Sequence, residues 1–234
     1  MTILALDTSS RAASCALMRD GVLVGEFFAN IGLTHSQTAM PMVAQLLAGT
    51  NLAITDIDAF AVSTGPGSFT GLRIGIAAVK GMAMASGKPC VGVSTLMALA
   101  AGGCLHRGYI CPVMDARRGQ VYTALFESDG KTLTRRWEDA ALSLEDLSDK
   151  LDEISSPILL VGDGAVVGIK ALGQKENLYL APERFLHQRA GAIASIANDI
   201  YHSGGLVSPA QLAPSYLRLP QAERERQLKT ERWK

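Results

Sequence analysis

The segment Leu72–Ala85 has the composition of a helix that is apolar on every face. Its only charged residues are Arg73 and Lys80, and all the others are Leu, Ile, Val, Met, Ala or Gly. A helix on the surface of a globular domain usually carries one apolar stripe and an opposite polar face. The earlier helical segment Ala39–Leu47, which follows a helix start at Thr34, also spreads its apolar residues too widely for one stripe. Both helices are therefore expected to be covered on two sides.

One side of each helix can rest on the sheet of its own domain, and two kinds of cover are open for the other side. More of the same chain can bury it, or a second chain can dock there. An uncovered face of this kind would form an apolar patch of the size that marks an interaction site. Small residues would let another helix approach closely. The candidate interface residues are Met40, Val43, Leu46, Leu47, Leu72, Ile76, Val79, Met82 and Ala83.

Strand-like and helical segments alternate along the chain, which is typical of an α/β protein. Strands are expected at Thr2–Ala5, Ser14–Met18, Val22–Phe28, Asp58–Ser63, Pro89–Val93, Tyr109–Met114, Gln120–Phe126 and Ile158–Val161. Further helices are expected at Thr95–Ala101, Ser143–Ile154 and Arg189–Tyr201. The Asp20-Gly21 turn predicts a β-hairpin between the second and third strands. The pair Gly102-Gly103 breaks the pattern and predicts a first domain over residues 1–103 and a second over 104–220.

The charge balance argues against a chain that holds nucleic acid by itself. Lys+Arg and Asp+Glu number 22 each, so the formal net charge is zero. A self-sufficient nucleic-acid binder usually shows a basic excess or a basic stripe. If the protein works on RNA, another chain is expected to carry most of the phosphate contacts.

The cysteines and the hydropathy pattern predict a soluble cytoplasmic protein. None of Cys15, Cys90, Cys104 and Cys111 forms a Cys-x-x-Cys pair, which indicates reduced thiols in the core. The first residues do not have the pattern of a signal peptide. No run reaches about 18 uninterrupted apolar residues, so no membrane span is expected.

The sequence offers little for metal binding or nucleophilic catalysis. The histidines His35, His106, His187 and His202 are far apart, and no His/Cys cluster with metal-ligand spacing exists. The glycine-rich run that contains Ser68 is not a Gly-x-Ser-x-Gly nucleophile elbow. Neither a metal site of its own nor a catalytic residue is expected.

Two turns are candidates for phosphate binding. The run Gly65–Ser68 lies between a strand and a helix, where backbone N–H groups can hold an anion, but it lacks the Lys of a P-loop. The turn after the first strand offers the hydroxyls of Thr8 and Ser9 for phosphate and Asp7 for a metal-bound water. Both runs also make ordinary tight turns, so nucleotide binding stays open here.

The opening strand with Leu6-Asp7-Thr8-Ser9, followed by a hairpin, resembles the start of the actin, hexokinase and heat-shock ATPase superfamily. That ribonuclease H-like fold has two related domains, with mixed sheets flanked by helices, around a nucleotide cleft. The run Ser63–Gly75, with Thr34-His35-Ser36 before it and Pro214–Arg218 near the end, is similar to the bacterial TsaB (YeaZ) family. The resemblance covers essentially the whole chain.

The resemblance implies a non-catalytic subunit required for threonylcarbamoyl transfer to the adenosine beside the anticodon of tRNAs that read codons starting with A. Such a subunit binds and activates the catalytic paralogue TsaD through the two apolar helices and helps to recruit the ATPase TsaE. It forms a homodimer through the same surface when alone and meets tRNA only through the complex. ATP, ADP and metal would belong to the partner complex, with no cofactor of its own. The alternative is a stand-alone nucleotide-using enzyme or peptidase of the same superfamily.

The comparison with the catalytic paralogue also implies a lost metal site. There, the strand that corresponds to Pro89–Val93 leads into a His-x-x-x-His pair. The corresponding positions here are Thr95 and Leu99, which cannot replace two imidazoles around a metal.

The end of the chain, residues 221–234, is charge-dense and expected to be mobile. Five basic residues face three acidic ones in this tail, and a tRNA-touching arm is the alternative interpretation. The basic residues are Arg224, Arg226, Lys229, Arg232 and Lys234, and the acidic ones are Glu223, Glu225 and Glu231.

Overall fold

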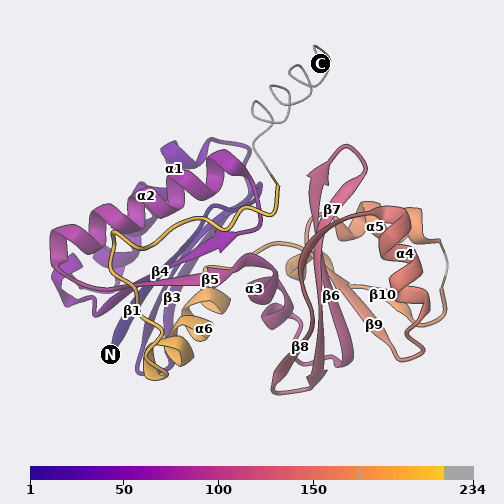
Figure 1. Cartoon of the computed structure of the whole chain (residues 1–234). Helices are drawn as coiled ribbons and strands as arrows, with labels where there is room; N and C mark the ends of the chain where they lie inside the picture. Colours follow the sequence, from indigo (N-terminus) through magenta and orange to yellow (C-terminus); the bar gives the residue numbers. More distant parts are fainter. Residues whose placement is uncertain (174, 219–234) are drawn as a thin grey trace, which may run out of the picture.

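A computed structural model describes residues 1–173 and 175–218 of the chain. Its first sheet has the strand order β3-β2-β1-β4-β5 (Figure 1). Strands β1, β2 and β3 pair antiparallel, whereas β4 and β5 run parallel to β1. The strands are β1 (Thr2–Asp7), β2 (Ala13–Arg19), β3 (Val22–Ala29), β4 (Ala59–Gly65) and β5 (Cys90–Ser94). All five were expected from the sequence, although β1 continues two residues further, to Asp7.

The second sheet repeats the topology of the first. Its order is β10-β9-β6-β7-β8, with β6, β7 and β8 antiparallel and β9 and β10 parallel to β6. The strands are β6 (Arg107–Arg117), β7 (Gln120–Asp129), β8 (Leu133–Ser143), β9 (Ile158–Val161) and β10 (Leu178–Leu180). The prediction of two related domains with mixed sheets is therefore confirmed. Strands β8 and β10 were missed because both are edge strands with polar or exposed residues rather than a buried apolar run.

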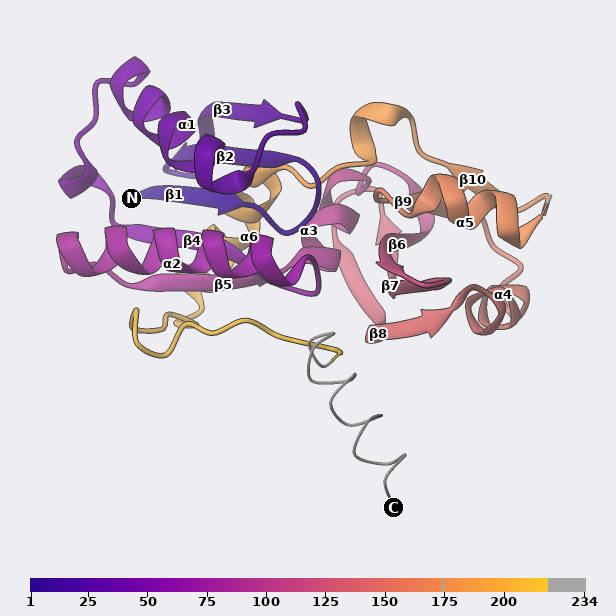
Figure 2. The same cartoon turned by 90° about the horizontal axis from the view of Figure 1, so that it is seen from above.

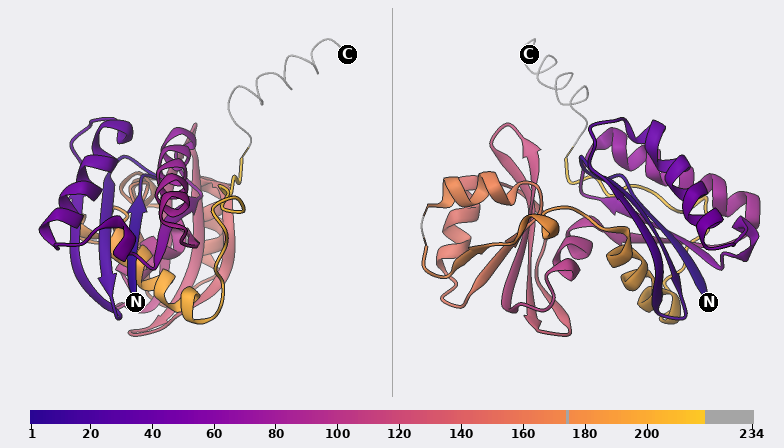
Figure 3. Two further views of the ribbon diagram at one scale, coloured as in Figure 1. Left: turned by 90° about the vertical axis from the view of Figure 1, so that its left-hand side faces the viewer. Right: turned by 180° about the vertical axis from the view of Figure 1, so that it is seen from behind.

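The helices form layers around the two sheets. Helices α1 (His35–Gly49) and α2 (Phe69–Ser86) cover the outer face of the first sheet, and α6 (Ala190–His202) covers its inner face (Figure 2, Figure 3). Helix α3 (Thr95–Gly102) lies between the two sheets. Helices α4 (Leu144–Asp152) and α5 (Ala165–Leu172) cover the far face of the second sheet. Short 3₁₀ turns occupy Ile54–Asp56 and Glu183–Phe185.

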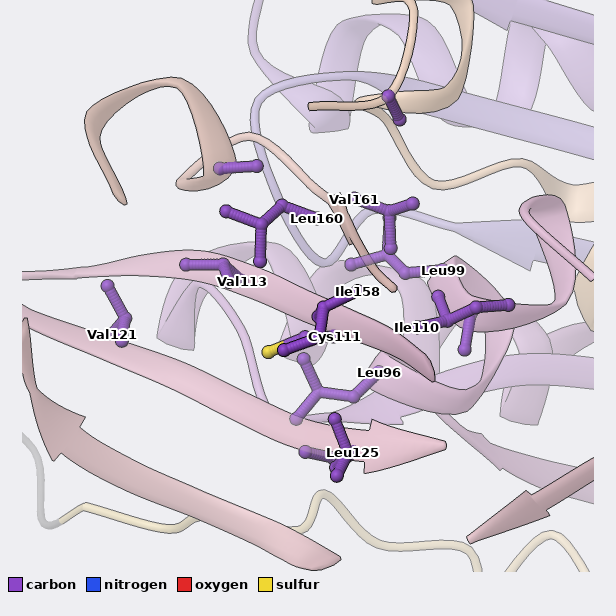
Figure 4. Close-up of a cluster of buried hydrophobic side chains, with 14 of the residues drawn as sticks. Leu96, Leu99, Ile110, Cys111, Val113, Val121, Leu125, Ile158, Leu160 and Val161 are labelled. Carbon is purple, nitrogen blue, oxygen red and sulfur yellow. The ribbon is translucent and has the colours of Figure 1, made fainter. Parts of the chain in front are cut away.

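Each sheet has its own apolar core. In the second domain, Leu96 and Leu99 of α3 pack on Ile110 and Cys111 of β6 (Figure 4). Burial of one such leucine side chain stabilises the folded state by about 1.5–3 kcal/mol. All four cysteines are free thiols, and Cys104 alone is only partly buried. Burial raises the pKa of the Cys111 thiol to about 12, which leaves it protonated at neutral pH.

The last described residues pack on the first domain, whereas the predicted boundaries placed them in a second domain of residues 104–220. Helix α6 packs on β1, β2 and β5 of the first sheet, not on the second. After it, a strap of residues 207–218 runs back along the first domain, where Val207 bridges Cys90 and the Ser215 N–H donates to the Thr64 carbonyl at 2.7 Å. The physical reason is that α1 and α2 cover only one face of the first sheet, and Ile193 with its neighbours covers the other.

The predicted tail at 221–234 lies outside the described residues. None of the helices in the described part of the chain has the length and apolar character needed to cross a membrane.

Candidate functional site

The turn after β1 holds a buried carboxylate. Asp7 ends the strand with 1% of its surface exposed, and the backbone N–H of Ser9 donates to its Oδ1 at 2.9 Å. The Ser9 hydroxyl donates to the same oxygen at 3.0 Å. Burial raises the pKa of Asp7 above its ordinary value. Its carboxylate therefore orders its own turn instead of facing solvent.

The first turn of α2 locks onto this loop. The Thr8 hydroxyl donates to the carbonyl of Gly71 at 2.8 Å, and the Ser68 N–H donates to the carbonyl of Ser9 at 2.6 Å. Thr8 and Ser9 are as buried as the neighbouring Asp7. The side chains of Asp7, Thr8 and Ser9 and the Ser68 N–H are thus engaged inside the protein.

The glycine-rich run owes its composition to this contact. Gly67, Gly71 and Gly75 recur every four residues: Gly71 and Gly75 lie one turn apart on one face of α2, and Gly67 precedes its N-cap residue Ser68. A Cβ at these three positions would lie 2.4, 2.0 and 2.4 Å from atoms of Ser9 or Thr8, closer than real Cβ contacts allow. The glycines let the helix touch the loop directly.

These contacts do not fit a phosphate and metal site at Asp7, Thr8 and Ser9, which were the candidate nucleotide-binding residues. A phosphate needs donors that face open space, whereas these side chains are covered by α2. In residues 1–173 and 175–218, no group of three or more His, Cys, Asp or Glu side chains is arranged to hold a metal ion.

The two positions compared with metal-binding histidines lie in the interior. Thr95 begins α3 and is fully buried, and its hydroxyl has no hydrogen-bond partner in the described structure. Leu99, one turn later, is 2% exposed and packs in the core of the second domain. Both side chains support the junction between the domains.

Seven of the nine predicted interface residues belong to the chain's own core, and this part of the prediction is wrong. Their side chains are at most 7% exposed, and all except that of Leu72 belong to the apolar core that includes residues of the first sheet. They are Val43, Leu46, Leu72, Ile76, Val79, Met82 and Ala83. Because the helices are apolar all round, the sequence did not show which apolar residues turn inward. Of the two remaining predicted interface residues, Met40 is exposed and Leu47 is half-buried.

The outward faces of α1 and α2 form a different surface, which we call the outer helix face. Met40 is 44% exposed and Met84 is 71% exposed. The small exposed residues of the same two helices are Ala44, Ala48, Ala77, Gly81 and Ala85. A Cβ at Gly81 would meet nothing within 4 Å. Neither helix has an acidic residue in its first turn or a basic one in its last, and both are apolar on average.

Edge strand β3 also exposes apolar side chains, which was not expected from the sequence. Val22 is 65% exposed, and Leu23, Val24 and Phe27 are 40–46% exposed. The segment has the near-continuous apolar character of a buried strand, so its composition gave no signal of exposure.

The histidine of the Thr34-His35-Ser36 run anchors the interdomain connection. His35 Nε2 lies 2.7 Å from the carbonyl oxygen of Ser10, and because that oxygen only accepts, Nε2 carries the proton. The Ser10 hydroxyl donates to Gln188 Oε1 at 2.6 Å. Gln188 precedes α6, so this chain of contacts ties the returning segment to the first domain.

The Pro214–Arg218 run contributes the end of the strap. The rings of Tyr216 and Phe69 stack with centroids 4.0 Å apart, and Arg73 Nε donates to the Tyr216 hydroxyl at 3.0 Å. The strap is thereby fixed to the start of α2. The runs Thr34–Ser36, Ser63–Gly75 and Pro214–Arg218 thus meet at one end of the first sheet.

Curated proteins with related sequences decide the family. The tRNA threonylcarbamoyladenosine biosynthesis protein TsaB of Escherichia coli is 35% identical over 221 residues, which are 93% of this chain and 95% of that protein. The TsaB protein of Bacillus subtilis is 35% identical over 227 residues, 95% of this chain and 96% of that one. The chain belongs to the TsaB family. The predicted TsaB membership is therefore confirmed.

Two further comparisons place the TsaB family member among its wider relatives. Residues 31–171 match the family model described as TsaD, tRNA N6-adenosine threonylcarbamoyltransferase, so the chain also falls within that broader family. The solved structure of YeaZ from Pseudomonas aeruginosa aligns with a TM-score of 0.81 at 30% identity, over 92% of this chain and 99% of that one.

A more distant structure shows the fold alone. The activator of the 2-hydroxyisocaproyl-CoA dehydratase from Clostridium difficile, solved with bound ADPNP, aligns with a TM-score of 0.51 at 13% identity. The alignment covers 88% of this chain and 97% of the activator. The TsaB family chain therefore shares an architecture with a protein that binds a nucleotide, while its own β1 turn is closed by α2.

Proposed function

We propose that the chain works in tRNA threonylcarbamoyladenosine biosynthesis as a non-catalytic subunit, and that the outer helix face docks on a TsaD-family protein. In this account the partner complex holds the ATP, ADP and metal, and the docked subunit activates the partner and helps to recruit TsaE. The observation that carries the proposal is an exposed apolar surface on two helices whose other sides are already buried.

The composition of the outer helix face supports a helix pair as the occupant. Two helices pack at 8–10 Å between axes, and small residues permit the shorter distances. Ala77 and Gly81 lie one turn apart on α2, and Met84 follows as a flexible side chain that adapts to an irregular neighbour. Exposed apolar side chains on two adjacent helices are typical of a protein-interaction site.

The family comparison supports the identity of the partner. The TsaD model matches residues 31–171, a range that contains both α1 and α2. A TsaD-family protein therefore has a counterpart of this region, and two such regions form a four-helix interface. A second copy of this chain offers the same face when the partner is absent.

The experiment is a binding titration between this chain and the TsaD-family protein of the same organism. The double variant Met40→Glu/Met84→Glu places two carboxylates in the outer helix face and is expected to weaken the complex at least 100-fold, because each charge would lose water without a partner. The control Val167→Glu changes a residue on α5 that is 58% exposed and is expected to bind like the unmodified protein.

Equal affinity for all three proteins would remove the outer helix face as the docking surface. The proposal of a non-catalytic subunit has its own check. The purified chain alone is expected not to turn over ATP or a peptide at an ordinary enzymatic rate of about 1 per second. Turnover at that rate would instead support the stand-alone enzyme.

A further inference from the structure

The strap of residues 207–218 is attached to the first domain along most of its length. Val207 forms an antiparallel bridge with β5, and Leu212 is 2% exposed in the apolar core of that domain. Near the end of the strap, the ring of Tyr216 stacks on Phe69 with the ring centroids 4.0 Å apart. The strap therefore has a fixed position on the first domain as far as Tyr216.

From this position, the side chain of Arg218 crosses to the second domain. Its Nη1 donates to the carbonyl oxygen of Ala116 at 2.6 Å, and Ala116 belongs to β6 near the tip of the β6–β7 hairpin. A guanidinium is a charged donor, and hydrogen bonds from charged groups are roughly twice as strong as those between neutral groups. One side chain of the strap thus joins the two domains.

A β-bulge makes the Ala116 carbonyl available for this contact. The pairing of β6 with β7 shifts between Asp115 and Arg117, so Ala116 is the extra residue and has no partner on β7. Ala116 is 9% exposed, whereas the residues on either side of it are exposed. A buried carbonyl outside the ladder needs a donor from elsewhere, and Arg218 supplies one.

The chain crosses between the domains twice, and the two crossings lie together. The first runs from β5 through α3 to β6, and the second runs through residues 181–189 from β10 to α6. Helices α3 and α6 are in contact. At the start of α3, the Ser94 hydroxyl donates to Asp139 Oδ2 of β8 at 2.7 Å. Two neighbouring connections hold the domains together but permit a rotation about them, so they form a hinge.

The Arg218 contact lies away from this hinge. In Figure 1, α3 lies in the lower half of the molecule, and the tip of the β6–β7 hairpin points upward. The end of the strap meets the hairpin on that upper side. A given rotation moves two groups further apart when they lie far from the hinge. A single contact at the hairpin tip therefore restrains the angle between the domains more than a contact beside α3.

We infer that the strap is a clasp, which holds the two domains at one angle through the contact of Arg218 with Ala116. With the clasp closed, the hairpin tip stays beside the first domain. Without it, the second domain turns about the hinge. Loss of a hydrogen bond from a charged group is expected to raise the ratio of open to closed chains about tenfold or more. The clasp is a property of the chain alone and does not depend on a docked partner.

Double electron–electron resonance between two spin labels tests the clasp in the purified full-length chain. The labels are attached through Gln45→Cys on α1 and Val167→Cys on α5, because both positions are exposed and lie in different domains. Cys104→Ser is present in every protein, since Cys104 is partly accessible and the other three cysteines are buried. Near-ultraviolet circular dichroism of each protein reports whether the domains are folded.

Two variants open the clasp, and one matched variant leaves it closed. Arg218→Ala removes the donor, and Tyr216→Ala removes the ring that holds the strap on Phe69. The control Arg136→Ala removes an arginine whose carboxylate partner, Glu127, lies on the same sheet.

The unmodified chain and the control are expected to give one narrow distribution of distances between the labels. Arg218→Ala and Tyr216→Ala are expected to add a population at longer distance, with an open-to-closed ratio at least tenfold higher than in the control. The circular dichroism spectrum should be the same for all four proteins, because the clasp sets the angle between domains that are already folded.

Three outcomes would overturn the clasp. The first is the same distance distribution for Arg218→Ala and Arg136→Ala, and the second is a broad distribution in the unmodified chain. The third is loss of the near-ultraviolet signal in Arg218→Ala, since the end of the strap would then support the folding of a domain. No partner protein is present in this experiment, so its result leaves the proposed function untouched.

Discussion

At the scale of single residues, the glycines at the start of α2 leave no room for a side chain beside the loop at Thr8 and Ser9. Gly71 has no room for a Cβ because the Thr8 carbonyl would lie 2.0 Å away. Gly81, three turns later in the same helix, faces open space. The structure therefore excludes a side chain at Gly71 and leaves room for one at Gly81.

Gly71→Ala is expected to lower the free energy of unfolding by about 1–3 kcal/mol, because the loop at Thr8 must move away from α2. Gly81→Ala is the matched control and is expected to raise it by about 0.5–1 kcal/mol, since alanine loses less backbone entropy in a helix. Urea unfolding of both variants checks this. Equal effects of the two substitutions would contradict the close contact.

Asp7 gives the molecule a pH dependence with a definite sign. Its pKa is raised by burial, so the folded protein holds the proton more tightly than the unfolded chain, where Asp titrates near pH 3.9. Stability from this group is therefore lost as the pH rises above about 4 through the folded pKa. Asp7→Asn is expected to flatten this part of the curve of melting temperature against pH. An unchanged curve would show that the carboxylate titrates normally.

At the scale of elements, the two faces of α2 have different surroundings. Val79 is fully buried against the first sheet, whereas Met84 is 71% exposed on the outer helix face. Composition alone predicted cover on two sides of α1 and α2; the structure buries one side of each against the first sheet, and cover on the outer helix face stays a prediction. Composition did not assign Val79 or Met82 to a side, because a helix without a polar stripe has no marked direction.

Val79→Glu is expected to lower the free energy of unfolding by about 3–5 kcal/mol, since a carboxylate would be buried without a partner. Met84→Glu is expected to change it by less than about 0.5 kcal/mol, because surface substitutions away from special contacts are nearly neutral. Thermal unfolding of the two variants measures the contrast. A stable Val79→Glu protein would contradict the assigned direction of α2.

Sequence patterns revealed most of the central strands and helices and the TsaB-family motifs, but not what the motifs do. The Asp7-Thr8-Ser9 turn suggests phosphate until Gly71 and Gly75 are seen to press against it. That contact joins residues more than 60 positions apart, and no local pattern encodes it. Edge strand β8 was missed because its composition is polar, and edge strand β10 was missed because it is only three residues long (Leu178–Leu180).

At the scale of the whole molecule, the first domain depends on both ends of the chain. Helix α6 and the strap cover the first sheet after the chain has completed the second domain. The first 103 residues thus contain the strands and the outer helices but lack one layer of their core. The expected division into 1–103 and 104–220 therefore does not produce two separable pieces.

The isolated fragment 1–103 is expected not to fold cooperatively, because the inner face of its sheet would be exposed to water. A chimaeric chain that joins residues 1–103 to residues 186–218 restores α6 and is expected to fold. Near-ultraviolet circular dichroism and dye binding to exposed apolar surface distinguish the two. Cooperative folding of the fragment alone would contradict the structural role of α6.

The outer helix face is the proposed docking surface for a TsaD-family protein. A photoreactive amino acid at position 84 of α2, compared with one at position 167 of α5, tests it directly in a mixture of the two proteins. Cross-links are expected from position 84 to the helices of the partner, and none are expected from position 167. Cross-links from position 167 with none from position 84 would contradict the proposed docking surface.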